Sequence, residues 1–164
     1  MLPLLIILTI IITTMRHEGA HALVTWLQGV PIHEMKLLPG VHPEQGFYFG
    51  YVSRGDGGNW MIDAAPFAAA VAWFLFFAPL YRRTPRHSKW RTPLFVVGMV
   101  SPIADLAYNY QGGLWRRGTD VWDLFQVLPA WWVHGAYLLA ISWMIVYTRR
   151  LGPVTRRNVS ADRR

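Results

Sequence analysis

Apolar residues in this chain are gathered into four long blocks, separated by polar stretches that are rich in glycine and proline. The blocks cover residues 2–28, 60–80, 93–110 and 129–147. Each approaches the roughly 20 residues that an α-helix needs to cross the hydrocarbon core of a bilayer. The pattern predicts an all-α membrane protein with about four transmembrane helices, which form a single transmembrane domain over residues 1–148.

The segment between the first two blocks, residues 30–59, has a different pattern. Short aromatic and β-branched runs stand between glycines there, most clearly from Gly46 to Val52, and such runs are typical of short strands. We therefore expect a small membrane-associated β-hairpin or sheet between spans one and two. At the other end of the chain, residues 149–164 are basic and polar, which predicts a disordered tail.

Composition and charge agree with a bilayer as the surrounding medium. The chain is 53% hydrophobic and only 15% charged, against about 25% charged residues in soluble globular proteins. Its net charge of +7 comes from Lys and Arg at the edges of the apolar blocks. This placement indicates contact with lipid headgroups. A nucleic-acid partner is disfavoured, because the sequence shows no basic stretch with interleaved aromatic residues. Most of these cations fall in the loop after the second block and in the tail, so the positive-inside rule places both termini of this multi-pass protein in the cytoplasm.

The first apolar block contains an HExxH motif made of His17, Glu18 and His21. Two histidines four residues apart on a helix face the same point, and the adjacent glutamate can act as the general base on water. Ionisable residues inside a span cost about 2.5–3.5 kcal/mol each, so their presence indicates a functional site. Because the chain has no Cys, any metal must be bound by His and carboxylates. We predict one Zn²⁺ per chain, held by His17 and His21, with Glu18 as the catalytic residue.

A third zinc ligand is needed, and the sequence offers two acids. Asp105 lies in the third block at a depth close to that of His17, if both helices are straight, and is the predicted ligand. Asp120 is the alternative third ligand, because on a continued helix it lies beyond the hydrocarbon core and reaches the site only if the chain folds back. Asp123 is predicted to be a cap or a first-turn acid of the last span.

The order of these motifs resembles the site-2 protease family of intramembrane zinc metalloproteases. His17–Leu23 resembles the signature helix of that family, and Gly50–Val52 resembles the glycine-tyrosine-valine strand that follows it. Ala65–Pro66 stands where the family has a glycine-proline pair, and Ser101–Pro102 with Asp105 stands where it has an asparagine-proline stretch followed by leucine-aspartate-glycine. The resemblance covers roughly residues 1–110 and implies a minimal catalytic core whose substrate is an unwound transmembrane helix of another protein.

These observations together predict an intramembrane zinc metalloprotease that cleaves a membrane-protein substrate. Substrate-binding residues are expected in the hairpin, at Tyr48, Gly50, Tyr51 and Val52, where an extended peptide could add to a strand edge. The alternative is a non-catalytic zinc-binding membrane scaffold or adaptor that retains the motif. A membrane di-iron oxygenase is disfavoured, because it needs several histidine clusters and this chain has one cluster among six His.

Overall fold

The computed structural model describes residues 2–42 and 46–151, and helices occupy all four apolar blocks. The helical elements are α1 (Leu2–Leu27), α2 (Met61–Arg83), α3 (Arg91–Phe95), the π-helical turn η1 (Val96–Val100), α4 (Ser101–Trp115), α5 (Asp120–Val127) and α6 (Ala130–Leu151). The predicted helical character of the blocks is confirmed. The short helix α5 was not predicted, and Asp123 lies in its first turn rather than in that of the last span.

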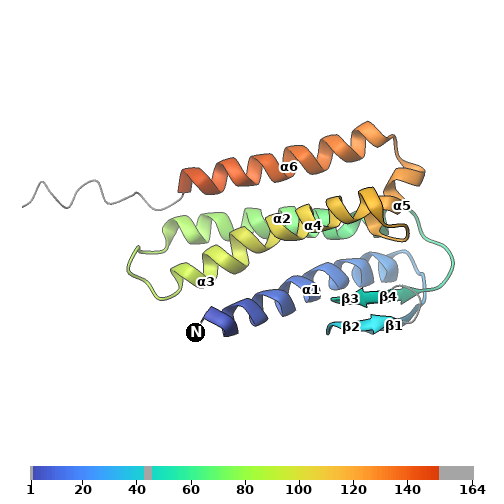
Figure 1. Cartoon of the computed structure of the whole chain (residues 1–164), viewed down its shortest axis with the longest axis horizontal. Coiled ribbons are helices and arrows are strands. Elements are labelled where there is room, and N and C mark those ends of the chain that lie inside the picture. Colours follow the sequence, from blue (N-terminus) through green and yellow to red (C-terminus); the bar gives the residue numbers. More distant parts are fainter. Residues whose placement is uncertain (1, 43–45, 152–164) are drawn as a thin grey trace, which may run out of the picture.

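Three helices of the described chain, α1, α2 and α6, are long and apolar enough to cross a membrane. The third predicted span, residues 93–110, is helical from Arg91 to Trp115, but η1 divides it into α3 and α4. Helices α1 and α3–α4 run in one direction along the molecule, and α2 and α6 run in the other (Figure 1). The α2–α3 connection and the C-terminal end of α6 therefore lie at one end of the molecule, and the strands and α5 lie at the opposite end.

Pro102 gives the physical reason for the π-helical turn. A proline inside a helix cannot donate a backbone hydrogen bond, and its ring clashes with the preceding turn. The chain widens just before it, so that the N–H of Ser101 donates to the carbonyl of Val96, five residues earlier. Gly98 lies in this turn, and a Cβ on it would come within 2.5 Å of the Cβ of Phe77 on α2. The turn thus lies close against α2 and sets the direction in which α4 continues.

The apolar core lies between α2, η1, α4, α5 and α6. Its fully buried members include Phe74 of α2, Met99 of η1, Leu106 of α4, Val121 of α5 and Met144 of α6. Because α5 contributes to this core, its position is fixed by apolar packing as well as by the short loops at its two ends.

Helix α1 has the reverse of the polarity found in a soluble protein. Its buried positions are polar and recur at helical spacing, at Thr14, Glu18, His21 and Thr25. Its exposed side is apolar, with Leu4, Ile6, Ile7, Leu8, Ile10, Met15, Leu23, Trp26 and Leu27. In water this arrangement would expose apolar surface and bury polar groups at a cost; surrounded by lipid it is favourable.

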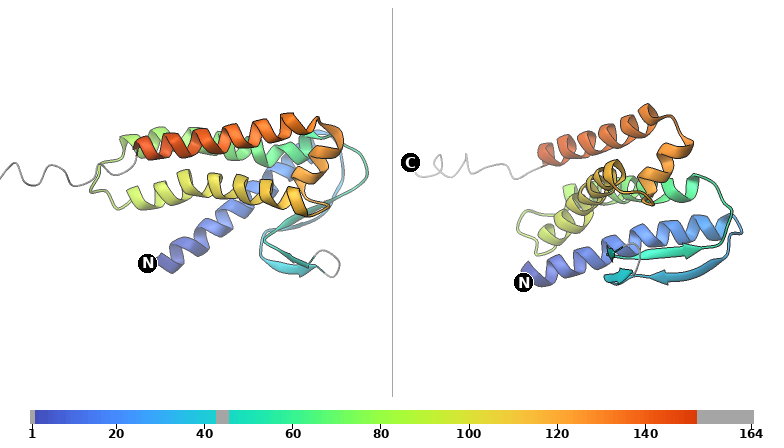
Figure 2. Two further views of the ribbon diagram at one scale, coloured as in Figure 1. Left: turned by 45° about the horizontal axis from the view of Figure 1, so that its top comes forward. Right: turned by 45° about the vertical axis from the view of Figure 1, so that its right-hand side comes forward.

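The strands form two antiparallel pairs beside the C-terminal half of α1 (Figures 1 and 2). β1 (Ile32–Lys36) pairs with β4 (Tyr51–Arg54), and β2 (Gly40–His42) pairs with β3 (Gly46–Tyr48). The predicted small sheet between the first two spans is confirmed. Figure 2 also shows that α1 is inclined to the other long helices. β1 and β4 pack on α1, and Arg54 of β4 also forms an ion pair with Asp63 of α2.

The C-terminal boundary differs from the predicted one. Helix α6 continues through Arg149 and Arg150 to Leu151, because both residues suit the last turn of a helix, where cations interact favourably with the macrodipole. The rest of the predicted tail, residues 152–164, lies outside the described residues.

Candidate metal centre

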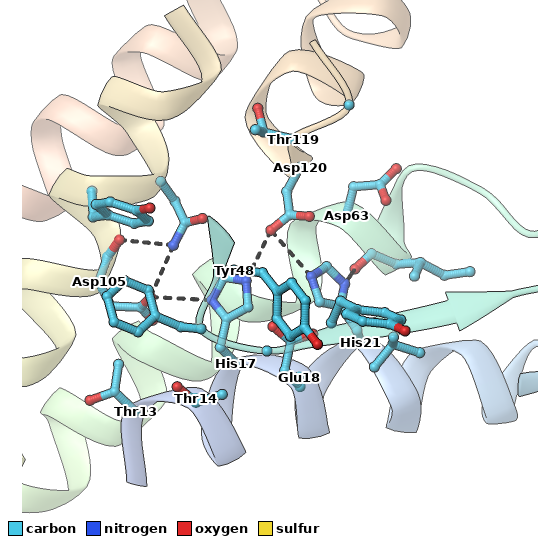
Figure 3. A pocket seen from close by; sticks show the side chains of 18 of the residues that line it. Thr13, Thr14, His17, Glu18, His21, Tyr48, Asp63, Asp105, Thr119 and Asp120 are labelled. Carbon is cyan, nitrogen blue, oxygen red and sulfur yellow. Dashed lines mark hydrogen bonds and ion pairs between the residues drawn. The ribbon is translucent and has the colours of Figure 1, made fainter. Parts of the chain in front are cut away.

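His17 and His21 lie one turn apart on α1, and their rings meet edge to face with centroids 5.2 Å apart. Both rings point away from α1 towards α4 and α5 (Figure 3). Helical spacing alone accounts for this, since residues four apart lie on one face.

Each imidazole is held through its Nδ1 atom. His17 Nδ1 lies 3.2 Å from Oδ1 of Asp105, and His21 Nδ1 lies 2.9 Å from the backbone carbonyl of Ile62 on α2. A carboxylate and a carbonyl can only accept, so both Nδ1 atoms donate. In neutral imidazoles the Nε2 atoms are then unprotonated and are available as metal ligands.

The third component is Asp120, at the start of α5. Its Oδ2 atom lies 3.1 Å from Nε2 of His17 and 3.2 Å from Nε2 of His21. The ligand atoms of His17, His21 and Asp120 all lie within 4.8 Å of one another, so this group could hold a metal ion. Three acceptor atoms at such distances repel one another unless a cation lies among them. Zinc bonds of about 2.0–2.2 Å at tetrahedral angles would place ligand atoms about 3.3 Å apart, so the residues fit that ion.

A reversal of the chain after α4 brings Asp120 to the histidines. α4 ends at Trp115, and Gly118 adopts a φ of 70°, which favours glycine because it has no Cβ. Thr119 then caps α5, its side chain accepting from the N–H of Trp122. α5 packs closely on α4, because Gly113 leaves room for the side chain of Val121. The chain thus folds back after α4, which is the condition under which the sequence allowed Asp120 to reach the site.

The geometry favours the alternative ligand, Asp120, over the predicted ligand, Asp105. Asp105 is buried and lies beside the site, but it contacts Nδ1 of His17 rather than the Nε2 face. Asn109, one turn later on α4, donates from Nδ2 to Oδ1 of Asp105 at 2.9 Å. Asp105 therefore orients a histidine from behind, as carboxylates commonly do around bound metals.

Glu18 is buried on α1 between the two histidines and borders a cavity of about 600 Å³. The cavity runs along α1 from Thr9 to Thr25 and is bounded by strand residues, by α4 and by the start of α5. The predicted catalytic residue and the two histidines thus share one cavity with Asp120 (Figure 3).

The predicted substrate-binding residues also border this cavity. Tyr48, Gly50, Tyr51 and Val52 all line it. Gly50 lies close against α1, since a Cβ on it would lie 2.9 Å from Cγ of Glu18 and 2.5 Å from Cγ2 of Thr14. The turn between β3 and β4 can touch α1 at Glu18 only because residue 50 has no side chain.

The pKa values of the two carboxyl groups of α5, Asp120 and Asp123, are shifted in opposite directions. Burial alone would raise the pKa of Asp120, but the imidazoles of His21 and His17 outweigh burial and lower that pKa below its ordinary value. Burial raises the pKa of Asp123, and the carboxylates of Asp63 and Asp120 raise it further. Asp120 is therefore the more acidic of these two carboxyl groups.

Some partners of the site could be found from the sequence and others could not. Asn109 follows Asp105 by four residues in one predicted helix, which places both side chains on one face. The carbonyl of Ile62 carries no sequence signal, because every residue has one and only the packing of α2 on α1 selects it.

No family model, curated protein or solved structure matches the chain. The residues of the site therefore provide the basis for inferring a function.

Proposed function

We propose that the protein is an intramembrane zinc metalloprotease that binds one Zn²⁺ per chain through His17, His21 and Asp120. The observation that carries the proposal is the convergence of two Nε2 atoms and a carboxylate oxygen, 3.1 and 3.2 Å apart, beside a buried glutamate. Three protein ligands leave the fourth position of a tetrahedral ion open, which is the pattern of catalytic rather than structural zinc sites.

When bound, zinc acts as a Lewis acid that polarises a carbonyl group and lowers the pKa of a coordinated water to about 7. Nitrogen and oxygen ligands in this number suit zinc, and the family that the motifs resemble uses the same ion. Iron in a di-iron oxygenase would need a second cluster of ligands, and among the described residues His17, His21 and Asp120 are the one group that could hold a metal.

Glu18 is the proposed general base. It occupies the position of the glutamate in HExxH, next to a ligand histidine, and borders the same cavity. In this role its carboxylate accepts a proton from the attacking water and returns a proton to the leaving amine. Asp105 and the Ile62 carbonyl hold the two imidazoles in the tautomer that this chemistry requires.

The proposed substrate is an extended segment of another membrane protein. β4 pairs with β1 on one side, and β4 residues line the cavity, so an added peptide strand could hydrogen-bond to the second edge of β4. The apolar outer side of α1 supports a position in the bilayer, with α3–η1–α4 as the fourth span. The alternative, a scaffold that binds zinc without hydrolysis, has the same ligands and differs only in activity.

Two measurements on detergent-purified protein test the proposal. Elemental analysis should give about one zinc per chain, and a reporter with a transmembrane segment should be cleaved. Glu18→Gln should keep its zinc and lose about 10²–10⁴-fold in cleavage rate, because it removes the base without removing a ligand. His17→Ala is the matched control and should lose zinc and activity together.

Each result has a defined meaning. Protein that contains zinc but does not cleave any transmembrane reporter supports the scaffold. Protein that binds no zinc after reconstitution contradicts both functions. A Glu18→Gln variant that loses zinc as His17→Ala does shows that Glu18 is a ligand.

A further inference from the structure

Arg16 differs from the other arginines of the described chain in being buried inside an apolar helix. Its side chain is only 5% exposed, and that of its partner Asp105 is 7% exposed. Placing a guanidinium at such a position is costly unless it is paired. A buried arginine at this position therefore needs an explanation. Arg16 contacts Asp105, and Asp105 contacts His17 of the proposed metal centre.

The guanidinium of Arg16 is held by α4 and α2. Nη2 donates to Oδ2 of Asp105 at 2.8 Å, and Nη1 lies 3.4 Å from the hydroxyl oxygen of Ser101. The guanidinium carbon also lies 5.6 Å from the centre of the Trp73 ring on α2. Arg16 does not border the cavity, so it is not placed to touch a substrate.

These contacts divide the two oxygens of Asp105 between different partners. Oδ2 faces Arg16, while Oδ1 accepts from His17 Nδ1 at 3.2 Å and from Asn109 Nδ2 at 2.9 Å. With Oδ2 engaged, the carboxylate cannot rotate freely about its χ2 bond, and Oδ1 remains directed at His17. The orientation of the ligand ring thus depends on a cation on the far side of the carboxylate.

We propose that Arg16 is a positioning residue for the metal centre. It fixes the Asp105 carboxylate, the carboxylate fixes the His17 ring, and Nε2 of His17 is thereby aimed at the metal position. The proposal rests on the proposed zinc site and adds a residue that the HExxH motif does not contain. It also explains why a charge stands directly before the motif inside an apolar helix.

A purely structural role is the competing explanation, because Arg16 also joins α1 to α4. Thr13 provides a matched control for that role. Its hydroxyl forms a 2.6 Å hydrogen bond with Ser101 of α4, one turn from Arg16, without touching Asp105. Thr13→Val removes a polar contact between the same two helices and leaves the carboxylate in place.

The test is zinc affinity, measured by chelator competition on purified full-length protein, together with thermal unfolding of each variant. Arg16→Gln should weaken zinc binding by about 10–100-fold, the usual effect of losing an outer-shell partner. Arg16→Lys should recover part of that loss, because an ammonium can pair with Oδ2 but lacks the planar fork. Thr13→Val should bind zinc as the wild type does, although its unfolding temperature falls.

A double-mutant cycle shows whether Arg16 acts through Asp105. If it does, Arg16→Gln with Asp105→Asn should bind zinc no more weakly than Asp105→Asn alone. Losses that multiply, or an Arg16→Gln protein with wild-type affinity, would overturn the proposal. Should Arg16→Gln fail to fold, the comparison of Arg16→Lys with Thr13→Val decides, and equal affinities for these two overturn it. The wild-type arm reports on the zinc site itself, so failure of the proposed function is seen separately.

Discussion

His17 has a carboxylate at each of its ring nitrogens. Asp120 lies 3.1 Å from Nε2 and Asp105 lies 3.2 Å from Nδ1. The two acids therefore have different tasks, although both are buried or partly buried near the same ring. One stands where a ligand of the metal would stand, and the other holds the ring from behind, as in the carboxylate–histidine–metal arrangement of many zinc sites.

The two acids should respond differently to substitution. Asp120→Ala removes one of the three proposed ligands and should yield protein with little zinc after purification. Asp105→Ala removes an outer-shell partner and should retain zinc with an affinity about 10–100-fold lower. Zinc content per chain at matched expression measures the difference. If Asp105→Ala lacked zinc and Asp120→Ala kept a full complement of zinc, the third ligand would be Asp105 and not Asp120.

The sequence identified His17, Glu18 and His21 because the spacing of HExxH carries its own geometry. The choice between Asp105 and Asp120 depended on whether the chain continues straight after α4. The local signals for a reversal are present, with a glycine at Gly118 followed by a capping threonine at Thr119, and such a pair marks the end of one helix and the start of another. Gly118 and Thr119 therefore predict a reversal better than a helix that continues straight through them.

At the scale of single elements, α1 combines two functions that are normally separate. One side of it supplies the buried polar residues of the site, and its other sides are apolar and exposed. The blocks of apolar residues predicted where helices lie, because that signal is long and local. The π-helical turn and α5 could not be read from these blocks, since each is short and is marked only by single residues, Pro102 for the turn and Gly118 with Thr119 for α5.

The turn between β3 and β4 provides a prediction about Gly50. Its φ is not positive, so alanine is allowed by the backbone, but the new Cβ would lie 2.8 Å from the carbonyl of Lys36 and 2.9 Å from Cγ of Glu18. Overpacking of this kind costs about 1–3 kcal/mol. If that cost falls on the placement of Glu18, Gly50→Ala should lower kcat/KM by roughly 5- to 150-fold while the zinc content stays normal.

Gly135→Ala is the matched control for this substitution. Gly135 lies in α6, and a Cβ there would meet nothing within 4 Å. The control should therefore cleave the reporter at the wild-type rate. Equal activity of both variants would show that the turn does not set the position of Glu18.

At the scale of the whole molecule, the cations are distributed unevenly between the two ends of the helices. The end that contains the α2–α3 connection and the last turn of α6 carries Arg82, Arg83, Arg86, Lys89, Arg91, Arg149 and Arg150. The opposite end carries Lys36, Arg54, Arg116 and Arg117. Four consecutive spans must alternate in direction, and the long helices do so (Figure 1). The inclination of α1 to the others leaves no signal in the order of the apolar blocks (Figure 2).

This distribution predicts that the α2–α3 end is cytoplasmic, and with it both termini. Since the chain has no Cys, single cysteines can report on orientation. A membrane-impermeant maleimide added to intact cells should label Arg117→Cys and should label His87→Cys only after the membrane is opened. The reverse pattern would place the α2–α3 end outside and contradict the charge rule for this protein.

Asp120 and His17 are 103 residues apart in the chain, and this separation has a consequence for biosynthesis. At about 5–20 residues per second, the ribosome makes Asp120 roughly 5–20 s after His17. During that interval α1 can already have left the translocation machinery with its two histidines but without their third partner. Under the proposed function, a nascent chain would lack the third ligand, and it would become active only after α5 has been synthesised and has folded back.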